Sequence, residues 1–237
     1  MIGFGVSFVG LFIYGMLGVI VSARSAVADD LPHREMIEGH LKARDIMDEG
    51  VLKAMGEIRR EAFVPEAMKS QAYLDQPLPI GHGQTISQPY IVALRTQVLE
   101  PKPTERVLEV GTGSGYQAAI LSRLVAQVYS VEIVEELAQK AEATLAAEGI
   151  GNVLVRTGDG YRGWPEEAPF DAIIVTCAPD HIPQPLMNQL REGGRMIIPV
   201  GEEGGIQKLV LLTKEKGEVQ QREILPVRFV PMTRETD

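Results

Sequence analysis

The sequence predicts an α/β fold, doubly wound, with a mostly parallel sheet covered by helices on both faces. Three observations support it. From residue 106 onward, strand-like apolar runs alternate with helical segments, which is the pattern of βαβ units. Residues 170–178 are almost continuously apolar, as expected for a strand buried on both faces. A glycine-rich turn at 111–115 joins the first strand to a helix, where such folds place their ligands.

Before this alternating region the sequence is helical. Between residues 33 and 60 apolar side chains recur at helical spacing, and Gly50 is expected to separate two helices. Pro65 ends the second helix or opens a short third one. These segments predict an N-terminal helical subdomain.

The segment 81–95, GHGQTISQPYIVALR, is rich in small polar side chains. It predicts a loop that leads into a helix, with Ser87 as the N-cap residue and Pro89 in the first turn. A helix start with exposed N–H groups attracts an anion, so this cap has both a structural and a functional interpretation.

The later elements follow in order. Predicted strands cover 106–110, 128–133, 152–159, 170–178 and 195–201, and predicted helices cover 115–125, 134–149 and 183–192. The last helix is expected to end before Gly193 and Gly194. Residues 206–230 predict an antiparallel strand pair at one edge of the sheet, with Lys216 and Gly217 at its turn.

Composition excludes several classes of protein. The net charge of −9 argues against a general nucleic-acid binder, which needs a basic surface. Cys177 is the only cysteine, so the chain forms no internal disulfide and no cysteine-based metal site. The four histidines are scattered without metal-ligand spacing, and we expect no metal site.

The glycine turn follows a strand that ends in Glu109, and its glycines are Gly111, Gly113 and Gly115. Glycine lets the chain turn tightly and brings backbone N–H groups close to a ligand. A dinucleotide fingerprint needs a further glycine where Tyr116 stands. A purely structural strand-to-helix turn remains the alternative.

Acidic residues follow the next two strands: Glu132 ends the second, and Asp159 with Gly160 follows the third. Singly, Glu132 could be a solvated strand-end acid and Asp159 a turn former. Together with the glycine turn, they resemble the S-adenosylmethionine-dependent methyltransferases. That resemblance implies that Glu109 to Gly115 cradle the amino-acid and ribose portion of the cofactor. It also implies that Glu132 binds the ribose hydroxyls and that Asp159 and Gly160 border the adenine.

A more specific resemblance covers the chain from about residue 35 to its end. The segments that carry it are REAFVP (60–65), GHGQTISQPYIVA (81–93), VLEVGTGSGYQAA (107–119), GDGYRGWPEEAPFDAIIVTCA (158–178), GGRMIIPVG (193–201) and VRFVPMT (227–233). They resemble the protein-L-isoaspartate O-methyltransferases. The resemblance implies methyl transfer from S-adenosyl-L-methionine to the free carboxylate of L-isoaspartyl residues in damaged proteins and peptides, which starts repair through a succinimide.

The same resemblance assigns roles in the opening segment. Ser87 would be the active-site hydroxyl, Gln84 and Thr85 would contact cofactor or substrate, and Thr233 would lie near the cofactor. Because the acceptor carboxylate is already ionised at neutral pH, the chemistry needs no general base. The rate should come from alignment and exclusion of water, so His82 is not expected to act as a base.

Residues 1–28 form a hydrophobic leader, and 29–237 are expected to form a single methyltransferase domain. Its two parts are a helical, substrate-lining part (29–100) and a cofactor-binding α/β core (101–237). Residues 1–21 carry no charged side chain and could cross a bilayer, which would give a membrane tether. Ala26-Val27-Ala28 has the form of a signal-peptidase site, so an exported, cleaved protein is an alternative, as is a misassigned start.

The nearest basic residues lie C-terminal to the leader, which favours a cytoplasmic body, and the cofactor is made in the cytosol. We therefore expect a cytoplasmic monomer, with the periplasm as the alternative location. Two other functions stay open. One is a methyltransferase for a different small-molecule or protein acceptor, and the other is an inactive, membrane-tethered binding module.

Overall fold

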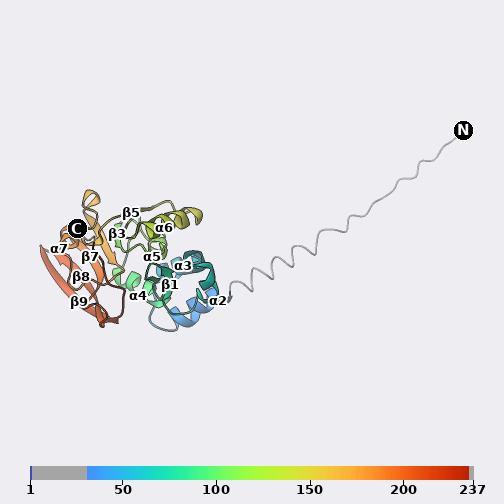
Figure 1. The fold of residues 1–237 in the computed structure, drawn as a ribbon, viewed down its shortest axis with the longest axis horizontal. Helices are drawn as coiled ribbons and strands as arrows, with labels where there is room; N and C mark the ends of the chain where they lie inside the picture. The colour runs from blue at the N-terminus through green and yellow to red at the C-terminus, as the bar shows by residue number, and fades with distance from the viewer. Residues whose placement is uncertain (2–30, 235–237) are drawn as a thin grey trace.

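The fold is a doubly wound α/β sheet, seen in a computed structural model that describes Met1 and residues 31–234 (Figure 1). Its main sheet has the strand order β5-β4-β3-β6-β7-β8-β9. The strands from β5 to β7 are parallel, and β8 and β9 are antiparallel additions at one edge. The predicted fold class is confirmed. The winding reverses between β3 and β6, and ligands of such sheets bind at that point.

The strands and helices of this core lie close to their predicted positions. They are β3 (Arg106–Val110), α5 (Tyr116–Ser122), β4 (Gln127–Glu132), α6 (Glu135–Ala147), β5 (Val153–Thr157), β6 (Phe170–Val175), α7 (Gln184–Gln189), β7 (Leu190–Val200), β8 (Gln207–Glu215) and β9 (Glu218–Val227). Short 3₁₀ turns η4 (Gly160–Arg162) and η5 (Pro165–Glu167) lie between β5 and β6.

The predicted helix over 183–192 is too long. Helix α7 ends at Gln189, and Leu190 already pairs with Phe170 as the start of β7. The register then shifts, so that Ala172 pairs with Arg195. Gly193 and Gly194 lie inside this irregular stretch of strand instead of following a helix, and Gly193 has a φ of 72°.

The N-terminal part is helical, as predicted, but its boundaries differ. It contains α2 (Leu31–Glu35), a π-helical segment η1 (Met36–Lys42), α3 (Glu49–Glu57), and 3₁₀ turns η2 (Arg60–Phe63) and η3 (Glu66–Gln71). Gly50 does not separate two helices, because it lies in the first turn of α3. Asp48 is the N-cap of that helix and accepts a hydrogen bond from the Val51 N–H at 2.9 Å.

The segment 81–95 forms a hairpin and a helix, not only a loop before a helix. Strands β1 (Leu78–Gly81) and β2 (Gln84–Ile86) pair antiparallel, and His82 at their turn has a φ of 52°. Helix α4 (Pro89–Leu99) follows, and its N-cap residue is Gln88. The predicted Ser87 cap is therefore wrong.

A distant carboxylate takes the capping role at α4. Asp75 Oδ1 accepts the Tyr90 N–H at 2.9 Å, and Asp75 Oδ2 accepts from the Gln88 amide at 2.7 Å. Arg44 completes the arrangement with an ion pair to Asp75 at 3.2 Å. The free N–H of this helix start is thus already satisfied within the protein.

Alternation along the strands divides the sheet into two apolar faces. Val107, Val128 and Ile174 pack with Leu99 of α4 and Leu121 of α5 on one face. Leu108, Val110 and Ile173 face the other way and pack with Leu186 of α7. Because side chains alternate, Glu109 points to the same face as Val107, toward α4 and α5.

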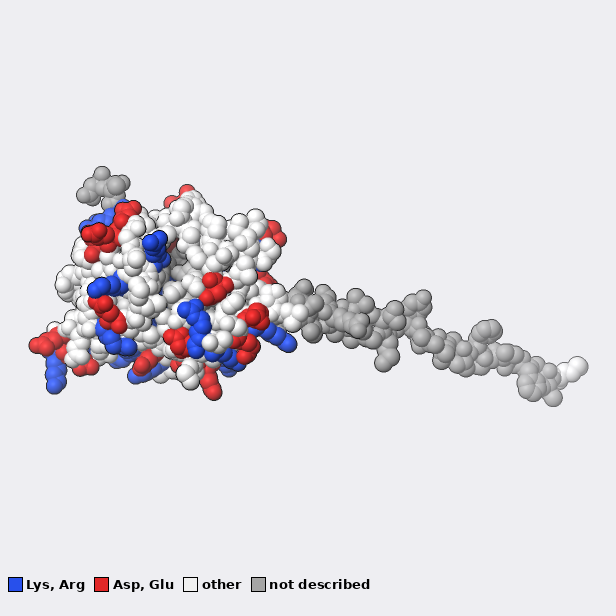
Figure 2. All heavy atoms as spheres, turned by 90° about the horizontal axis from the view of Figure 1, so that it is seen from below, with Lys and Arg blue, Asp and Glu red and all other residues white. Residues whose placement is uncertain are grey.

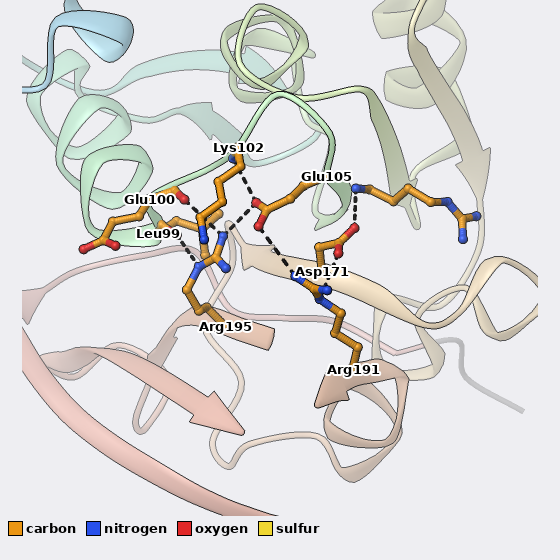
Figure 3. Close-up of polar contacts among 8 residues, drawn as sticks. Leu99, Glu100, Lys102, Glu105, Asp171, Arg191 and Arg195 are labelled. Atoms are coloured by element: carbon orange, nitrogen blue, oxygen red, sulfur yellow. Dashed lines mark hydrogen bonds and ion pairs between the residues drawn. The ribbon is translucent and has the colours of Figure 1, made fainter. Parts of the chain in front are cut away.

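A buried ion-pair network ties the amino ends of the strands together (Figure 3). Glu105 is 2% exposed and pairs with Arg195 of β7 at 2.7 Å. Arg195 also donates from Nε to the Leu99 carbonyl at the end of α4. Next to it, Asp171 accepts from the Arg106 N–H at 2.7 Å and pairs with Arg191 at 2.8 Å. The network lies at the opposite end of the sheet from the carboxyl edge.

Replacement of Glu105 should destabilise the fold. Glu105→Gln leaves the Arg195 guanidinium without its counter-charge, and this side chain is only 13% exposed. Removal of one partner from a buried pair costs about 3 kcal/mol of the free energy of unfolding. Urea denaturation would measure the loss, with Glu142→Gln on the exposed face of α6 as the control. Equal stability of the two variants would show that the network contributes little.

No helix within residues 31–234 has the length and apolar character needed to cross a membrane. Apart from Met1, the predicted leader, 1–28, and its possible membrane tether, 1–21, lie outside the described residues.

Candidate functional site

Three cavities meet at the carboxyl edge of the sheet. The large cavity, of about 550 Å³, is lined by Arg44, Pro77, Thr85, Ser87, Gln88, Tyr90, Ile91, Thr176, Ile206 and residues 225–230. The sheet-edge cavity, of about 50 Å³, is lined by Gln84, Thr85, Val110, Gly111, Gly113, residues 131–133, Gly160, Thr176, Cys177 and residues 230–233. The polar cavity, of about 30 Å³, is lined by residues 85–87, Val92, Arg95, residues 111–114, Tyr116, Gln117 and Thr176.

The glycine turn forms the wall between the sheet and these cavities. Gly111, Gly113 and Gly115 all have positive φ values, of 95°, 55° and 86°. A Cβ atom at Gly111 would lie 2.4 Å from the Thr176 Oγ1, so only glycine fits this close approach. Gly111 and Gly113 line the sheet-edge cavity. Gly115 lines none of the three cavities; it is the N-cap of α5, packed close to Ala141 of α6.

Glu132 closes one side of the sheet-edge cavity. It ends β4, is 6% exposed, and accepts hydrogen bonds from the Gly113 N–H at 2.7 Å and the Val134 N–H at 3.0 Å. The carboxylate therefore holds the glycine turn while lining the cavity. A carboxylate in this position can accept hydrogen bonds from the hydroxyls of a ligand.

Glu109 lies behind the glycine turn and not in a cavity wall. It is fully buried on the α4/α5 face and lines none of the three cavities. Ser130 donates a short hydrogen bond to Glu109 Oε2, and Thr112 Oγ1 lies 2.6 Å from the Ser130 hydroxyl. Burial raises the pKa of Glu109 to about 8, although the Ser130 hydrogen bond and the Arg95 charge act against that shift. Glu109 thus supports the glycine turn from the α4/α5 side of the sheet, through its hydrogen bond to Ser130 and the contact of Ser130 with Thr112.

Asp159 and Gly160 have different roles: Asp159 caps a 3₁₀ turn, and Gly160 lines a cavity. Asp159 caps η4 by accepting the Tyr161 N–H at 2.8 Å, and its side chain lines none of the three cavities. Gly160 does line the sheet-edge cavity. A Cβ at Gly160 would lie 2.5 Å from Val110 Cγ1 and 3.1 Å from Met232 Cε, so a side chain there would push into the cavity wall.

The C-terminal segment covers the sheet-edge cavity. The Ala178 N–H donates to the Val230 carbonyl at 2.8 Å, and the Met232 N–H donates to the Ala178 carbonyl at 2.9 Å. These two bonds bring Thr233 to the cavity wall, close to Gly160 and Glu132 in the same lining. The predicted Thr233 thus lies together with Gln84, Thr85 and Glu132.

Ser87 lies between the large and the polar cavities and lines both. Among residues 31–234 its hydroxyl has no hydrogen-bond partner, because Asp75 and not Ser87 caps α4. Thr85 lines all three cavities. The hydroxyl of Ser87 is therefore free to contact a ligand at the point where the cavities converge.

Sequence reasoning missed two residues of this site. Thr176 follows β6, lines all three cavities, and donates to the Gly111 carbonyl at 2.5 Å. Its position at the carboxyl end of the strand next to β3 is the feature that could have indicated it. Arg95 lines the polar cavity from the middle of α4, where its place in an apolar helix gave no indication of a role.

Comparison with known proteins agrees with this geometry. A sequence model of the family described as protein-L-isoaspartate(D-aspartate) O-methyltransferase matches residues 31–237. The protein-L-isoaspartate O-methyltransferase of Opitutus terrae is 56% identical over 200 residues, which are 84% of this chain and 86% of the relative. That of Gloeobacter violaceus is 52% identical over 200 residues, which are 84% of this chain and 98% of the relative.

Solved structures give the same result. A protein-L-isoaspartate O-methyltransferase superposes with a TM-score of 0.77 at 33% identity, over 84% of this chain and 65% of that one. A Plasmodium falciparum protein of the same designation, solved in complex with S-adenosyl-L-homocysteine, superposes with a TM-score of 0.76 at 29% identity, over 86% of this chain and 99% of that one. This chain therefore belongs to the protein-L-isoaspartate(D-aspartate) O-methyltransferase family.

Proposed function

We propose that this protein transfers the methyl group of S-adenosyl-L-methionine to the free carboxylate of L-isoaspartyl residues in damaged proteins and peptides. The observation that carries the proposal is the position of Ser87 and Thr85. They stand where a cavity large enough for a peptide segment meets two small cavities along the glycine turn. Membership of the family supports the type of reaction, and the junction of the three cavities is the location that we propose for it.

The residues around the sheet-edge cavity fit the cofactor. The positive-φ glycines leave the strand ends open, and Gly160 keeps the wall between Val110 and Met232 thin. Glu132 offers carboxylate oxygens for the ribose hydroxyls, and Gln84, Thr85 and Thr233 offer further polar groups. We assign Gly111, Gly113 and Gly160 to the cofactor wall. Glu109, Gly115 and Asp159 act by holding that wall.

The bound cofactor would supply the methyl group from its sulfonium, and the neutral thioether of S-adenosyl-L-homocysteine would be the leaving group. The protein's own contribution is alignment, since the acceptor carboxylate is ionised at neutral pH and needs no base. Ser87 donates a hydrogen bond that orients the carboxylate oxygen toward the cofactor side. Thr85 and Thr176 line all three cavities and so stand between them, and residues 230–233 form part of the wall of the sheet-edge cavity. Orientation of two reactants in this way lowers the barrier without a catalytic acid or base.

A paired-peptide assay tests this function. The enzyme should methylate an isoaspartyl peptide and not its aspartyl twin, and the product ester should be labile to base. Equal methylation of both peptides would contradict the proposed acceptor. No methylation, with retained binding of S-adenosyl-L-homocysteine in calorimetry, would point to a different acceptor. An absence of binding would contradict the cofactor assignment as well.

Removal of the Glu132 charge should weaken cofactor binding. Glu132→Gln keeps the side-chain size but loses the charge of its hydrogen bonds to Gly113, Val134 and the ribose. Charged hydrogen bonds contribute about 1.5–3 kcal/mol each, so the dissociation constant for S-adenosyl-L-homocysteine should rise at least about 10-fold. Calorimetry measures it, with the conservative exchange Glu135→Gln on exposed α6 as the control. An unchanged constant would remove Glu132 from the ribose site.

The acidic net charge supports a peptide partner over a nucleic acid. The face shown in Figure 2 mixes Lys and Arg with Asp and Glu, without a basic stripe. We further infer a single catalytic domain over 29–237, divided into a substrate-lining part (29–100) and a cofactor-binding core (101–237). Arg44, Thr85 and Ser87 of the first part and Thr176 and residues 225–230 of the second enclose the large cavity together, which supports this division.

We infer a monomer on the cytoplasmic side of the membrane, where the cofactor is made. The charge-free residues 1–21 and the basic residues after them support that orientation. Cell fractionation with N-terminal sequencing of the mature protein tests the location, and light scattering tests the monomer. A mature chain that starts at Asp29 in the periplasm would contradict the cytoplasmic assignment.

A further inference from the structure

Arg95 is a buried cation that the proposed reaction does not yet use. It lies in the middle of α4 and is 1% exposed. Its Nε donates to the Gln117 side chain at 2.6 Å, and Gln117 donates to Thr96 Oγ1 at 2.9 Å. These hydrogen bonds hold the Nε end of the Arg95 guanidinium in place.

The other end of the guanidinium lacks an acceptor. Nη1 of Arg95 is buried and has no hydrogen-bond partner, and among residues 31–234 no carboxylate oxygen lies within 4.0 Å of Arg95. The Glu109 carboxyl interacts with Arg95 over a longer distance, and its own pKa is raised to about 8, which weakens it as a counter-charge at neutral pH. The Phe229 ring also faces the guanidinium, with its centroid 5.6 Å from the Arg95 Cζ atom. Neither partner accepts a hydrogen bond from Nη1, so an anion that contacts this atom would stabilise the buried cation.

The polar cavity is where that anion would lie. Arg95 lines it together with Thr85, Ser87, Thr112 and Ser114, which are all hydroxyl side chains. With about 30 Å³ it is larger than the roughly 10–15 Å³ that one water needs, and far smaller than a nucleoside. A small anionic group with several hydrogen-bond acceptors, such as a carboxylate, fits this lining.

Two carboxylates are available in the proposed reaction: that of the substrate and that of the amino-acid end of the cofactor. The substrate enters from the large cavity, which Ser87 lines and Arg95 does not. The polar cavity instead shares Thr85, Gly111, Gly113 and Thr176 with the sheet-edge cavity, where the nucleoside would lie. The position of Arg95 is thus continuous with the cofactor wall.

We propose that Arg95 binds the carboxylate of the amino-acid end of S-adenosyl-L-methionine, and so makes the cofactor site specific for a ligand that carries this group. The inference rests on the proposed function. In this arrangement the cofactor's carboxylate lies in the polar cavity. The Ser87 hydroxyl then binds the substrate's carboxylate, which enters from the adjacent large cavity.

A comparison of two ligands tests this proposal. One is S-adenosyl-L-homocysteine, and the other is its decarboxylated form, 5′-deoxy-5′-(3-aminopropylthio)adenosine. The wild-type protein should bind the first more tightly, on the order of 10- to 100-fold, because a charge-assisted hydrogen bond is lost with the carboxylate. In Arg95→Met the two ligands should bind almost equally. Calorimetry measures both constants without turnover.

Arg60→Met is the matched control. Arg60 is also fully buried with unpartnered Nη atoms, and its pKa, like that of Arg95, is lowered to about 10 by burial. It lines none of the three cavities, so its replacement should leave the ratio of the two dissociation constants unchanged. If Arg95→Met does not fold, Arg95→Gln takes its place: it removes the charge but keeps a polar side chain next to Gln117, and it should lose most of the preference.

The outcomes separate the two proposals. If the wild-type protein binds neither nucleoside, the proposed function fails. If it binds S-adenosyl-L-homocysteine and Arg95→Met, or Arg95→Gln in its place, keeps the full preference for the carboxylate, the role of Arg95 is wrong. An unchanged preference with a raised KM for the isoaspartyl peptide would also overturn it, because Arg95 would then serve the substrate.

Discussion

Ser87→Ala should lower kcat/KM for an isoaspartyl peptide by about 100-fold, because an acceptor displaced by about 1 Å loses that much in rate. The hydroxyl has no hydrogen-bond partner among residues 31–234 and lines the cavities on both sides of the junction. Its removal should therefore take away a hydrogen bond to the substrate and no hydrogen bond within the described protein. Binding of S-adenosyl-L-homocysteine should stay unchanged in calorimetry.

The capping arrangement at α4 provides a sharp control for this result. Since Asp75 accepts the Tyr90 N–H, Asp75→Ala should cost about 1 kcal/mol of stability, as loss of a helix cap does. Ser87→Ala should show no such loss in urea denaturation. A destabilised Ser87→Ala with normal kcat/KM would mean that the residue acts structurally, and the exposed Ser70→Ala should change neither property.

Much of the fold follows from local sequence patterns. The alternation of strands and helices predicts the doubly wound sheet, because each pattern has its own period and needs no knowledge of distant residues. The turn at Lys216 and Gly217 was also predictable, and both residues have positive φ values, of 54° and 78°. The glycine turn and Glu132 were found for the same reason: they follow strand ends that the topology brings to one edge.

The errors have a common cause, which is dependence on residues far away in the sequence. Ser87 has the sequence pattern of a cap, but Asp75 competes for the same N–H from a loop 15 residues away from Tyr90. Leu190 continues a helical pattern, but pairing with Phe170 makes it a strand residue. Arg95 reads as an ordinary helix residue until the sheet and α5 bury it beside the polar cavity.

Glu109 shows most clearly that a strand-end acid can belong to the core. The family resemblance places it in the cofactor cradle, whereas alternation along β3 directs its side chain under α4 and α5. It is 0% exposed, and its Oε1 has no hydrogen-bond partner within the part of the chain that the structure describes. The resulting rise of its pKa to about 8 has a measurable consequence for the stability of the protein.

Glu109→Gln should become progressively more stable than the wild type as the pH rises. Because the folded pKa of about 8 exceeds the unfolded value of about 4.3, the folded wild-type protein keeps a proton that the unfolded chain releases between these values. Wild-type stability therefore falls as pH rises through this window, by up to about 1.4 kcal/mol per pH unit from this group. The Gln variant has no proton to lose there. Hydrogen bonds that the amide of this variant gains or loses do not depend on pH. They therefore change the difference in unfolding free energy between the two proteins by a constant amount and leave its dependence on pH unchanged.

Urea denaturation of both proteins at several pH values between 5 and 9 measures that slope. Ser130→Ala sharpens the test, because the Ser130 hydroxyl donates to Glu109 and favours its ionised form. Without that hydrogen bond the Glu109 pKa should rise further, so the decline in stability should extend to higher pH before it levels off. A constant difference between Glu109→Gln and the wild type across the range would show that Glu109 is ionised in the folded protein. It would then be a direct counter-charge for Arg95, which would leave Arg95 less able to attract the carboxylate of the cofactor.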